Sequence, residues 1–336
     1  MKMIGFNRGS GVDEQGGLFD TVGETPVPGP RDVLVQVRAV GVNPLDTKVR
    51  AGRVEVPERV VTLGWDAAGI VHAVGNDVTS LAPGQAVYYA GSFDRAGANA
   101  EYHLVDERIA ARMPAALDFA QAASVPLAAL TAWQLLFERF AITPGDRQPR
   151  GSLLVLGGAG GVGSLLIQLA RQLTGLTVIA TASRGDSMEW CRAMGAHHVI
   201  DHRQPLPAQV AALKVAPVRH VAALSHTAQH VAELAELIAP HGKLAVIDDH
   251  DAFDAAPLKG KSVSLHWEMV FTRPLYLTDD MQEQQRILQR VAGLLDEGVL
   301  RHTLRQCLSP MDAATLRRAH VLLERGGQPG KIVVSD

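Results

Sequence analysis

Cysteine is scarce in this chain, which has only Cys191 and Cys307 among its 336 residues. Two cysteines form neither a disulfide framework nor a four-cysteine zinc site. A protein that does without disulfides suits a reducing compartment. The sequence therefore predicts a cytoplasmic protein.

An excess of charge of one sign is absent as well: 32 Lys and Arg stand against 35 Asp and Glu, a net charge of −3. This balance gives no electrostatic footprint for nucleic acid. The first residues, MKMIGFNRGSG, lack the apolar core of a signal peptide, and the chain has no internal repeat or low-complexity tract. With 47% hydrophobic and 20% charged residues, the sequence predicts a soluble two-domain protein, with neither nucleic acid nor membrane as a partner.

The apolar stretch at residues 153–172, LLVLGGAGGVGSLLIQLARQ, is interrupted by five glycines. A membrane span would not carry these glycines at its centre and a charge at Arg171. Apolar residues precede the glycines, and the leucines that follow have the spacing of one helical face: Leu165, Leu166, Leu169 and Leu173. The pattern predicts a strand, a tight glycine turn and a helix.

Gly158, Gly160 and Gly163 form G-x-G-x-x-G between the predicted strand and helix. Side chains in such a turn would block the phosphates of a dinucleotide, which the backbone N–H groups and the helix dipole attract. A lone match is weak evidence in a chain with 32 glycines. Its place between a strand and a helix nevertheless favours nucleotide binding.

The residues after the next predicted strand, Thr177–Thr181, distinguish the two nicotinamide cofactors. NAD-binding folds usually place Asp or Glu about 20 residues beyond the glycines, but here the sequence reads Ala182, Ser183 and Arg184. A hydroxyl followed by a guanidinium would bind the 2′-phosphate that an acidic side chain would repel. The sequence predicts NADPH. The alternative is that Arg184 is a solvated loop charge and Asp186 turns back to the ribose.

Strands and helices alternate from residue 153 to about 247. The strands expected there are 153–157, 177–181, 198–201, 220–224 and 243–247. Such alternation predicts an α/β fold, a Rossmann-type doubly wound parallel sheet with helices on both faces. Residues 262–267 would add an edge strand, which favours a homodimer joined through a continuous sheet. Before this region the chain is β-rich, with alternating polarity at 33–40.

Several separate motifs carry a resemblance to a known superfamily. They are GVNPLDTKVRAG (41–52), GWDAAGIVHAVG (64–75), GANAEYHLVDE (97–107), PLAALTAW (126–133), GGAGGVG (157–163) and GKIVV (330–334). In this order they resemble the medium-chain dehydrogenase/reductase superfamily, its zinc-independent quinone oxidoreductase branch, and bacterial proteins labelled zinc-type alcohol dehydrogenase-like. The resemblance covers essentially the whole chain. It implies a β-rich GroES-like catalytic domain at 1–125 and 271–336 and a Rossmann dinucleotide-binding domain at 126–270.

The positions of zinc ligands in zinc-containing relatives hold other residues here. Asn43 stands in place of a cysteine, and Gly64–Trp65–Asp66 stands in place of Gly-His-Glu. The four clustered cysteines of a structural-zinc loop are missing near residue 95. Because a catalytic zinc needs about three protein ligands, the sequence predicts no metal site.

The histidine clusters do not change this prediction. His226 and His230 stand four residues apart, but Thr227 replaces the Glu of H-E-x-x-H. His197 and His202 flank the third predicted strand. For His202 the resemblance suggests another use, because relatives carry an aromatic residue here near the adenosine end of NADPH, where an imidazole would pack or hydrogen-bond.

The resemblance implies reduction rather than alcohol oxidation. NADPH would deliver a hydride to a quinone or to the β-carbon of an α,β-unsaturated carbonyl compound, a small molecule in either case. Negative charge would build on the carbonyl oxygen and need stabilisation. Asn43 is the first candidate for a polar group in the cleft, with Asp46 beside it and Trp65 as a pocket wall. Lys48 is a proton donor or a surface lysine, and the alternative for the whole chain is an NADPH-binding protein with a non-enzymatic structural or interaction role.

The remaining cofactor contacts follow from the motif match and from the carboxyl ends of the strands, which line the crevice in such folds. Lys331 is left open between a ligand contact and a solvated lysine, and is outside the candidate set. That set is Thr131, Gly158, Gly160, Gly161, Val162, Gly163, Ser183, Arg184, His202, Ser225, Thr227, Asp248 and Phe271.

Overall fold

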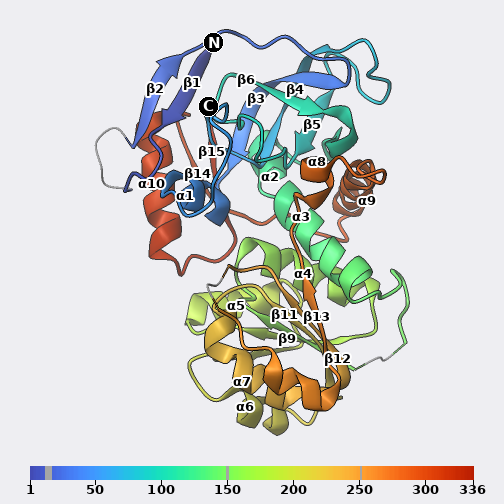
Figure 1. The fold of residues 1–336 in the computed structure, drawn as a ribbon. Helices are drawn as coiled ribbons and strands as arrows, with labels where there is room; N and C mark the ends of the chain where they lie inside the picture. Colours follow the sequence, from blue (N-terminus) through green and yellow to red (C-terminus); the bar gives the residue numbers. More distant parts are fainter. Residues whose placement is uncertain (12–16, 149–150, 250–251) are drawn as a thin grey trace. The chain divides into compact units, whose positions relative to one another are not determined.

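The computed structural model describes residues 1–11, 17–148, 151–249 and 252–336. The chain forms two units (Figure 1). The first comprises Met1–Leu130, Phe271–Gly326 and Lys331–Asp336, and the second comprises Thr131–Val270 and Gly327–Gly330. Within the described ranges, no helix has the length and apolar character that a membrane crossing needs.

The first unit is a β-structure with short helices at its margins. Its strands are β1 (Lys2–Phe6), β2 (Leu18–Val22), β3 (Asp32–Gly41), β4 (Ala67–Val74), β5 (Ala86–Tyr89), β6 (Tyr102–Asp106), β7 (Ala110–Arg112), β14 (Leu304–Leu308) and β15 (Lys331–Ser335). Its helices are α1 (Pro44–Arg50), α2 (Phe119–Ala123), α8 (Thr272–Tyr276), α9 (Glu283–Asp296), α10 (Ala313–Arg325) and the 3-10 turn η1 (Glu107–Ile109), while α3 (Pro126–Trp133) continues into the second unit.

Strand β3 is the central strand of the first unit. The seven-stranded sheet has the order β14-β15-β3-β4-β5-β7, and β6 also pairs with β3. The alternating polarity of residues 33–40 predicted a strand here, and β3 confirms it. Strand β15 runs antiparallel to β3 with Val333 opposite Gly41. This pairing brings the C-terminal strand beside the segment that follows Gly41.

The second unit is built from parallel strands and connecting helices. Its strands are β8 (Ser152–Leu156), β9 (Thr177–Thr181), β10 (His198–Ile200), β11 (Val218–Ala223), β12 (Ile238–Val246) and β13 (Ser264–Trp267). Its helices are the π-helix η2 (Gln134–Arg139), α4 (Gly161–Leu173), α5 (Gly185–Ala193), α6 (Leu206–Ala212), α7 (Thr227–Leu237) and the 3-10 helix η3 (Ala256–Lys261).

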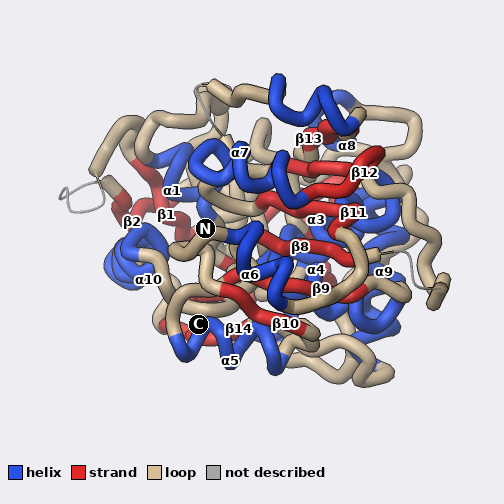
Figure 2. Tube along the Cα trace, turned by 90° about the horizontal axis from the view of Figure 1, so that it is seen from below, coloured by secondary structure: helices blue, strands red, loops and turns tan. Residues whose placement is uncertain are grey.

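The six strands lie in the order β10-β9-β8-β11-β12-β13, as Figure 2 shows. All five strand pairs are parallel. The chain steps outward from β8 to β10 and then crosses to the other side of β8, so the order reverses between β8 and β11. This is the strand order of the dinucleotide-binding fold, in which ligands bind beyond the carboxyl ends at the reversal. The predicted fold class is confirmed, and β13 is the edge strand that the sequence indicated.

Strand β12 differs most from its expected bounds, while the other predicted strands agree within two residues at each end. Residues 243–247 were expected as the strand, but β12 begins at Ile238, directly after α7. The pairing with β11 is irregular there, because Ile238 faces Val218 and regular register resumes only at Lys243. His241 has a φ of 60°. Proline and glycine at 240 and 242 look like a turn in the sequence, and the structure accommodates them as an irregularity inside the strand.

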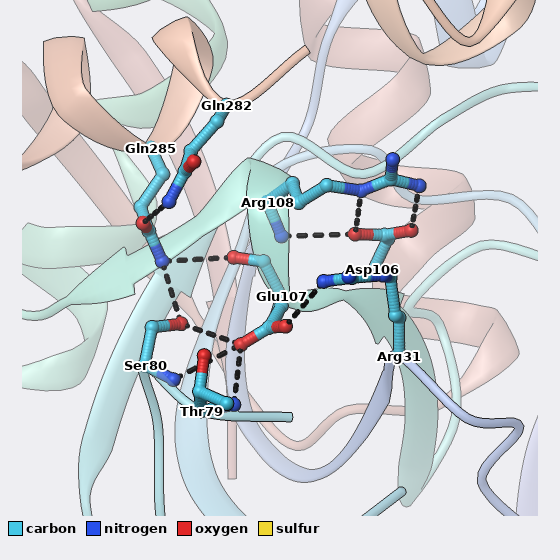
Figure 3. Close-up of polar contacts among 8 residues, drawn as sticks. All are labelled: Arg31, Thr79, Ser80, Asp106, Glu107, Arg108, Gln282 and Gln285. Atoms are coloured by element: carbon cyan, nitrogen blue, oxygen red, sulfur yellow. Dashed lines mark hydrogen bonds and ion pairs between the residues drawn. The ribbon is translucent and has the colours of Figure 1, made fainter. Parts of the chain in front are cut away.

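A buried carboxylate fixes one corner of the first unit, the Glu107 corner, which consists of Arg31, Thr79, Ser80, Glu107 and Gln285 (Figure 3). Oε2 of Glu107 accepts hydrogen bonds from Thr79 N at 2.9 Å, Ser80 N at 3.0 Å and Ser80 Oγ at 2.8 Å. Arg31 Nη1 lies 3.1 Å from Oε1. Gln285 donates to Ser80 Oγ and to the Glu107 carbonyl oxygen, so these hydrogen bonds link helix α9 to η1 and to the loop that contains Ser80.

Candidate functional site

The glycine turn, residues 157–163, joins β8 to α4 in the second unit. Gly157 has a φ of 83°, which residues with side chains rarely adopt. Its N–H donates to Thr181 Oγ1 at 3.1 Å, and the N–H of Gly158 donates to the Thr181 carbonyl oxygen at 3.1 Å. The end of β9 therefore holds the turn in place.

The three motif glycines serve different purposes. A Cβ on Gly158 would lie 2.8 Å from Ala180 Cβ, and one on Gly163 would lie 2.5 Å from the Gly157 carbonyl oxygen, so both permit close packing. A Cβ on Gly160 would meet nothing nearer than 3.7 Å. Gly160 thus lines open space at the start of α4, a helix of 13 residues that no side chain caps among the described residues. Open space before a helix N-terminus fits a pyrophosphate, and Gly161 and Val162 form the first turn.

Ser183 and Arg184 follow β9 and precede α5. Arg184 is exposed, and within the described residues its guanidinium has no hydrogen-bond or ion-pair partner. The Ser183 carbonyl oxygen accepts a hydrogen bond from Arg203 Nη2 at 2.6 Å. Asp186 accepts hydrogen bonds from the N–H and the hydroxyl of Ser187. The guanidinium of Arg184 at the end of β9 therefore suits a phosphate, whereas that of Arg203 is paired with Asp201.

Ser225, Thr227 and Asp248 lie beyond the carboxyl ends of β11 and β12, as the glycine turn lies beyond that of β8. A Cβ on Gly157 would come within 2.7 Å of Ser225 Oγ, so Ser225 touches the turn. The N–H of Thr227 donates to Asp248 Oδ2 at 2.9 Å, and its hydroxyl donates to Asp248 Oδ1. The structure thus places these three candidates, like the glycine turn, beyond the carboxyl ends of the parallel strands.

The last three cofactor candidates are His202, Thr131 and Phe271, which come from different parts of the chain. His202 follows β10, and burial lowers its pKa, with a contribution from the nearby His230 and His226. Thr131 is buried in α3, at the start of the second unit. Phe271 belongs to the first unit, where its ring meets Phe93 edge-on with centroids 5.3 Å apart.

The first unit contains a buried polar network, the Asp66 network, which consists of Asn43, Asp46, Asp66 and Lys331. The ammonium of Lys331 donates to the Val42 carbonyl oxygen at 3.1 Å, to Asn43 Oδ1 at 2.5 Å and to Asp66 Oδ2 at 2.9 Å. The side chains of Lys331 and Asp66 are 6% and 0% exposed. Asp46 accepts from Asn43 N at 2.7 Å and from Gly64 N at 3.0 Å.

Burial dominates the electrostatics of this network. It raises the pKa of Asp46 to about 6, against the opposing effects of the Asn43 N–H and the Lys331 charge. It also raises the pKa of Asp66, although Lys331 lies in direct contact. Desolvation disfavours a buried charge more than one neighbouring cation favours it. Perturbed carboxyl groups of this kind are typical of functional sites.

The network changes the roles available to the catalytic candidates. Nδ2 of Asn43 donates to the Gly41 carbonyl oxygen and to Asp66 Oδ2, each at 3.3 Å, while its Oδ1 accepts from Lys331. The Asn43 amide is therefore engaged within the protein. Trp65 is 1% exposed, and its Nε1 has no hydrogen-bond partner among the described residues.

The residues at the zinc-ligand positions do not fit zinc. An amide and an indole stand there (Asn43 and Trp65), whereas catalytic zinc takes thiolate, imidazole or carboxylate ligands. Across the described ranges, no three His, Cys, Asp or Glu side chains gather as a metal site would require.

Two residues in these sites were not in the candidate set. Lys331 is placed by the pairing of β15 with β3, a contact between distant segments that has no local signal. Arg203 follows β10 and forms an ion pair with Asp201 at 2.8 Å. For Arg203 the sequence did carry a signal, since a basic residue directly after the third predicted strand would lie near the carboxyl ends of the strands.

Comparisons with known proteins agree with this geometry. Two family models match the chain: alcohol dehydrogenase GroES-like domain over residues 29–115, and zinc-binding dehydrogenase over residues 194–334. The zinc-type alcohol dehydrogenase-like protein SAS2087 of Staphylococcus aureus strain MSSA476 is 38% identical over 338 residues, covering 100% of each chain. The solved structure of a protein from Rhizobium etli CFN 42, named as a zinc-dependent alcohol dehydrogenase, is 50% identical with a TM-score of 0.95, covering 100% of this chain and 98% of the other.

Two further similarities carry more specific names. The NADPH-dependent alkenal/one oxidoreductase of Arabidopsis thaliana is 39% identical over 179 residues, which cover 51% of this chain and 45% of that protein. The quinone oxidoreductase of Pseudomonas syringae pv. tomato DC3000 is 26% identical with a TM-score of 0.83, covering 100% of this chain and 99% of the other.

Proposed function

Since the chain belongs to the zinc-type alcohol dehydrogenase-like family of the medium-chain dehydrogenase/reductase superfamily and is an oxidoreductase, we propose that it is an NADPH-dependent reductase. Its substrates would be quinones or α,β-unsaturated carbonyl compounds. Hydride transfer would proceed without zinc.

The observation that carries the cofactor assignment is the end of β9. Ser183 and Arg184 occupy the place where NAD-binding folds usually hold an acidic residue. Arg184 is exposed, and Arg203 holds the backbone of Ser183. Asp186, the acidic residue nearest in sequence, is engaged with Ser187. A guanidinium at this position binds the 2′-phosphate that distinguishes NADPH from NADH.

The substrate class is proposed from the similar proteins and from the donor set. One relative is named as an NADPH-dependent alkenal/one oxidoreductase, and one similar structure is a quinone oxidoreductase. Asn43 and Trp65, at the zinc-ligand positions, leave no metal to polarise an alcohol. When bound, NADPH supplies the hydride. The fit of these residues supports reduction of an activated double bond or a quinone.

The catalytic candidates keep positioning roles in this proposal. Asp46 and Lys331 hold Asn43 from two sides, through its N–H and its Oδ1. The segment that begins α1 is thereby fixed in a single geometry. Trp65 is buried and follows Gly64, whose N–H donates to Asp46, and it would form a wall of the pocket.

The test compares Arg184→Ala with Arg192→Ala, which removes the same charge from the other end of α5. Dissociation constants for NADPH and NADH are measured by fluorescence titration. We expect Arg184→Ala to weaken NADPH binding about 10- to 100-fold with little change for NADH, because a charge-assisted hydrogen bond contributes about 1.5–3 kcal/mol. Arg192→Ala should change neither constant.

Consumption of NADPH with a panel of quinones and enones then tests turnover. Oxidation with at least one acceptor supports the reductase. Tight NADPH binding without oxidation by any acceptor would favour the alternative, a non-enzymatic binding protein. An unchanged cofactor preference in Arg184→Ala overturns the cofactor assignment.

A further inference from the structure

We propose that Gly327 is a positioning residue for cofactor specificity, because its lack of a side chain makes room for the guanidinium of Arg184. The inference rests on the proposed function, since it concerns the residue assigned there to the 2′-phosphate. It adds a second residue, distant in sequence, on which the preference for NADPH depends.

The contact lies where the chain leaves α10. Gly326 and Gly327 follow this helix with φ values of 65° and 82°. The three atoms nearest to a Cβ on Gly327 would all belong to one group: Nη1, Nη2 and Cζ of Arg184. They lie so close that the guanidinium and a methyl group exclude each other. The guanidinium of Arg184 therefore packs on the bare backbone of Gly327.

The segment Gly327–Gly330, the return segment, also touches the glycine turn. The N–H of Gly330 donates to the Ala159 carbonyl oxygen at 2.8 Å, and Gly330 forms a β-bridge with Gly160. All of these residues belong to the second unit. One short segment thus contacts both the turn that fits the pyrophosphate and the guanidinium assigned to the 2′-phosphate.

Packing on Gly327 is the contact that locates the guanidinium. Within the described residues, no hydrogen bond or ion pair holds the Arg184 side chain. An arginine head group at the end of a flexible side chain moves at low cost, so a methyl group at position 327 would displace it rather than disrupt the fold. The effect of a substitution should fall on the placement of the charge, and hence on NADPH more than on NADH.

Gly326 provides a matched control, because it shares the positive φ but has nothing within 4 Å of its would-be Cβ. Gly326→Ala and Gly327→Ala each place a side chain at a positive φ, a strain of order 1–3 kcal/mol. Dissociation constants for NADPH and NADH are measured for both variants. We expect Gly327→Ala to lower the preference for NADPH about 10-fold, and Gly326→Ala to leave the preference unchanged. If strain unfolds Gly327→Ala, Gly327→Asn replaces it, because Asn adopts positive φ more often than Ala, and its ratio is compared with that of the unaltered protein.

A double variant tests whether Gly327 acts through Arg184. In the Arg184→Ala background, Gly327→Ala should cause no further change in the NADPH-to-NADH ratio. An additional loss there, or equal ratios for the two glycine variants, would overturn the inference. The proposed function fails separately, if the unaltered protein shows no preference for NADPH or if Arg184→Ala alone leaves that preference unchanged.

Discussion

The Asp66 network and the Glu107 corner both bury carboxyl groups in the first unit, but the surrounding protein shifts the pKa values of these groups in different directions. Asp46 and Asp66 are 1% and 0% exposed, and Glu107 is 3% exposed. Burial raises the pKa of Asp46 to about 6. Burial also acts to raise the pKa of Glu107, but hydrogen bonds from Ser80 and Thr79 lower it below its usual value. The two pKa values therefore shift in opposite directions: desolvation prevails at the deeply buried Asp46, and hydrogen bonds prevail at Glu107, whose carboxylate lies nearer the surface beside the exposed Arg31.

The donors to the carboxylates differ as well as the depth of burial. One oxygen of Glu107 accepts three short hydrogen bonds from neutral groups, and an arginine faces the other oxygen. Asp66 shares one ammonium with Asn43 and the Val42 carbonyl oxygen, and it accepts two longer hydrogen bonds, from Asn43 Nδ2 at 3.3 Å and from Leu127 N at 3.2 Å. A carboxylate whose charge is fully solvated by the protein stabilises the fold, whereas one whose charge is incompletely compensated remains poised to gain a proton. Substitutions at the two places test this distinction.

The largest effect is expected for Lys331→Met, which leaves Asp66 buried without its cation. Removal of one partner of a buried ion pair costs about 3–5 kcal/mol. We expect a decrease of this size in the free energy of unfolding, measured with urea at neutral pH. Lys2→Met, at an exposed position of β1, should change it by less than about 0.5 kcal/mol.

The double variant Lys331→Met with Asp66→Asn tests whether the cost of Lys331→Met comes from the unpaired charge of Asp66. Since the buried charge is then gone, part of the lost stability should return. A cost for Lys331→Met no greater than that for Lys2→Met would show that the Asp66 network does not hold an uncompensated charge.

The next effect concerns the pH dependence of stability through Asp46. Its pKa rises from 3.8 when the chain is unfolded to about 6 in the folded protein. The folded state therefore binds more protons between these values, and stability falls as the pH rises from about 4 to 6. Asp46→Asn removes this dependence, which amounts to on the order of 2–3 kcal/mol.

Urea unfolding of the unaltered protein and of Asp46→Asn at pH values across this window gives the measurement. The difference in their free energies of unfolding should change by that amount and become constant above about pH 6. Asp77→Asn, at an exposed position, should leave the trend as it is in the unaltered protein. Parallel pH profiles for the unaltered protein and Asp46→Asn would show that the pKa of Asp46 does not rise on folding.

Local patterns in the sequence predicted most of the second unit. The predicted strand 177–181 has the bounds of β9, and the strand expected at 262–267 is the edge strand β13. A buried parallel strand is a short apolar run between turns, and such runs are legible without knowledge of their neighbours. Strand β12 was predicted too short, because Pro240 and Gly242 resemble a turn but lie within the strand.

The candidate sites differ in the same way: some are formed by one local segment and others by segments far apart in the sequence. The glycine turn is local, so its pattern was legible. The Asp66 network joins Asn43 to Lys331 across 288 positions, and the contact of Gly327 with Arg184 also joins distant segments. No spacing in the sequence encodes such pairs. They follow from the antiparallel pairing of β15 with β3 and from the course of the return segment.

The smallest effect is expected at the Glu107 corner. Glu107→Gln keeps the shape of the side chain but removes the charge that Thr79, Ser80 and Arg31 stabilise (Figure 3). Because the pKa of Glu107 is lowered on folding, its charge contributes stability above pH 4.5, and this contribution is lost as the pH falls through the folded value. Glu107→Gln should therefore lower the free energy of unfolding by about 1–2 kcal/mol at pH 7 and by less in acid. Urea unfolding at several pH values, with exposed Glu24→Gln as the control, distinguishes this corner from the Asp66 network, since stability changes with pH in the opposite direction at the two places.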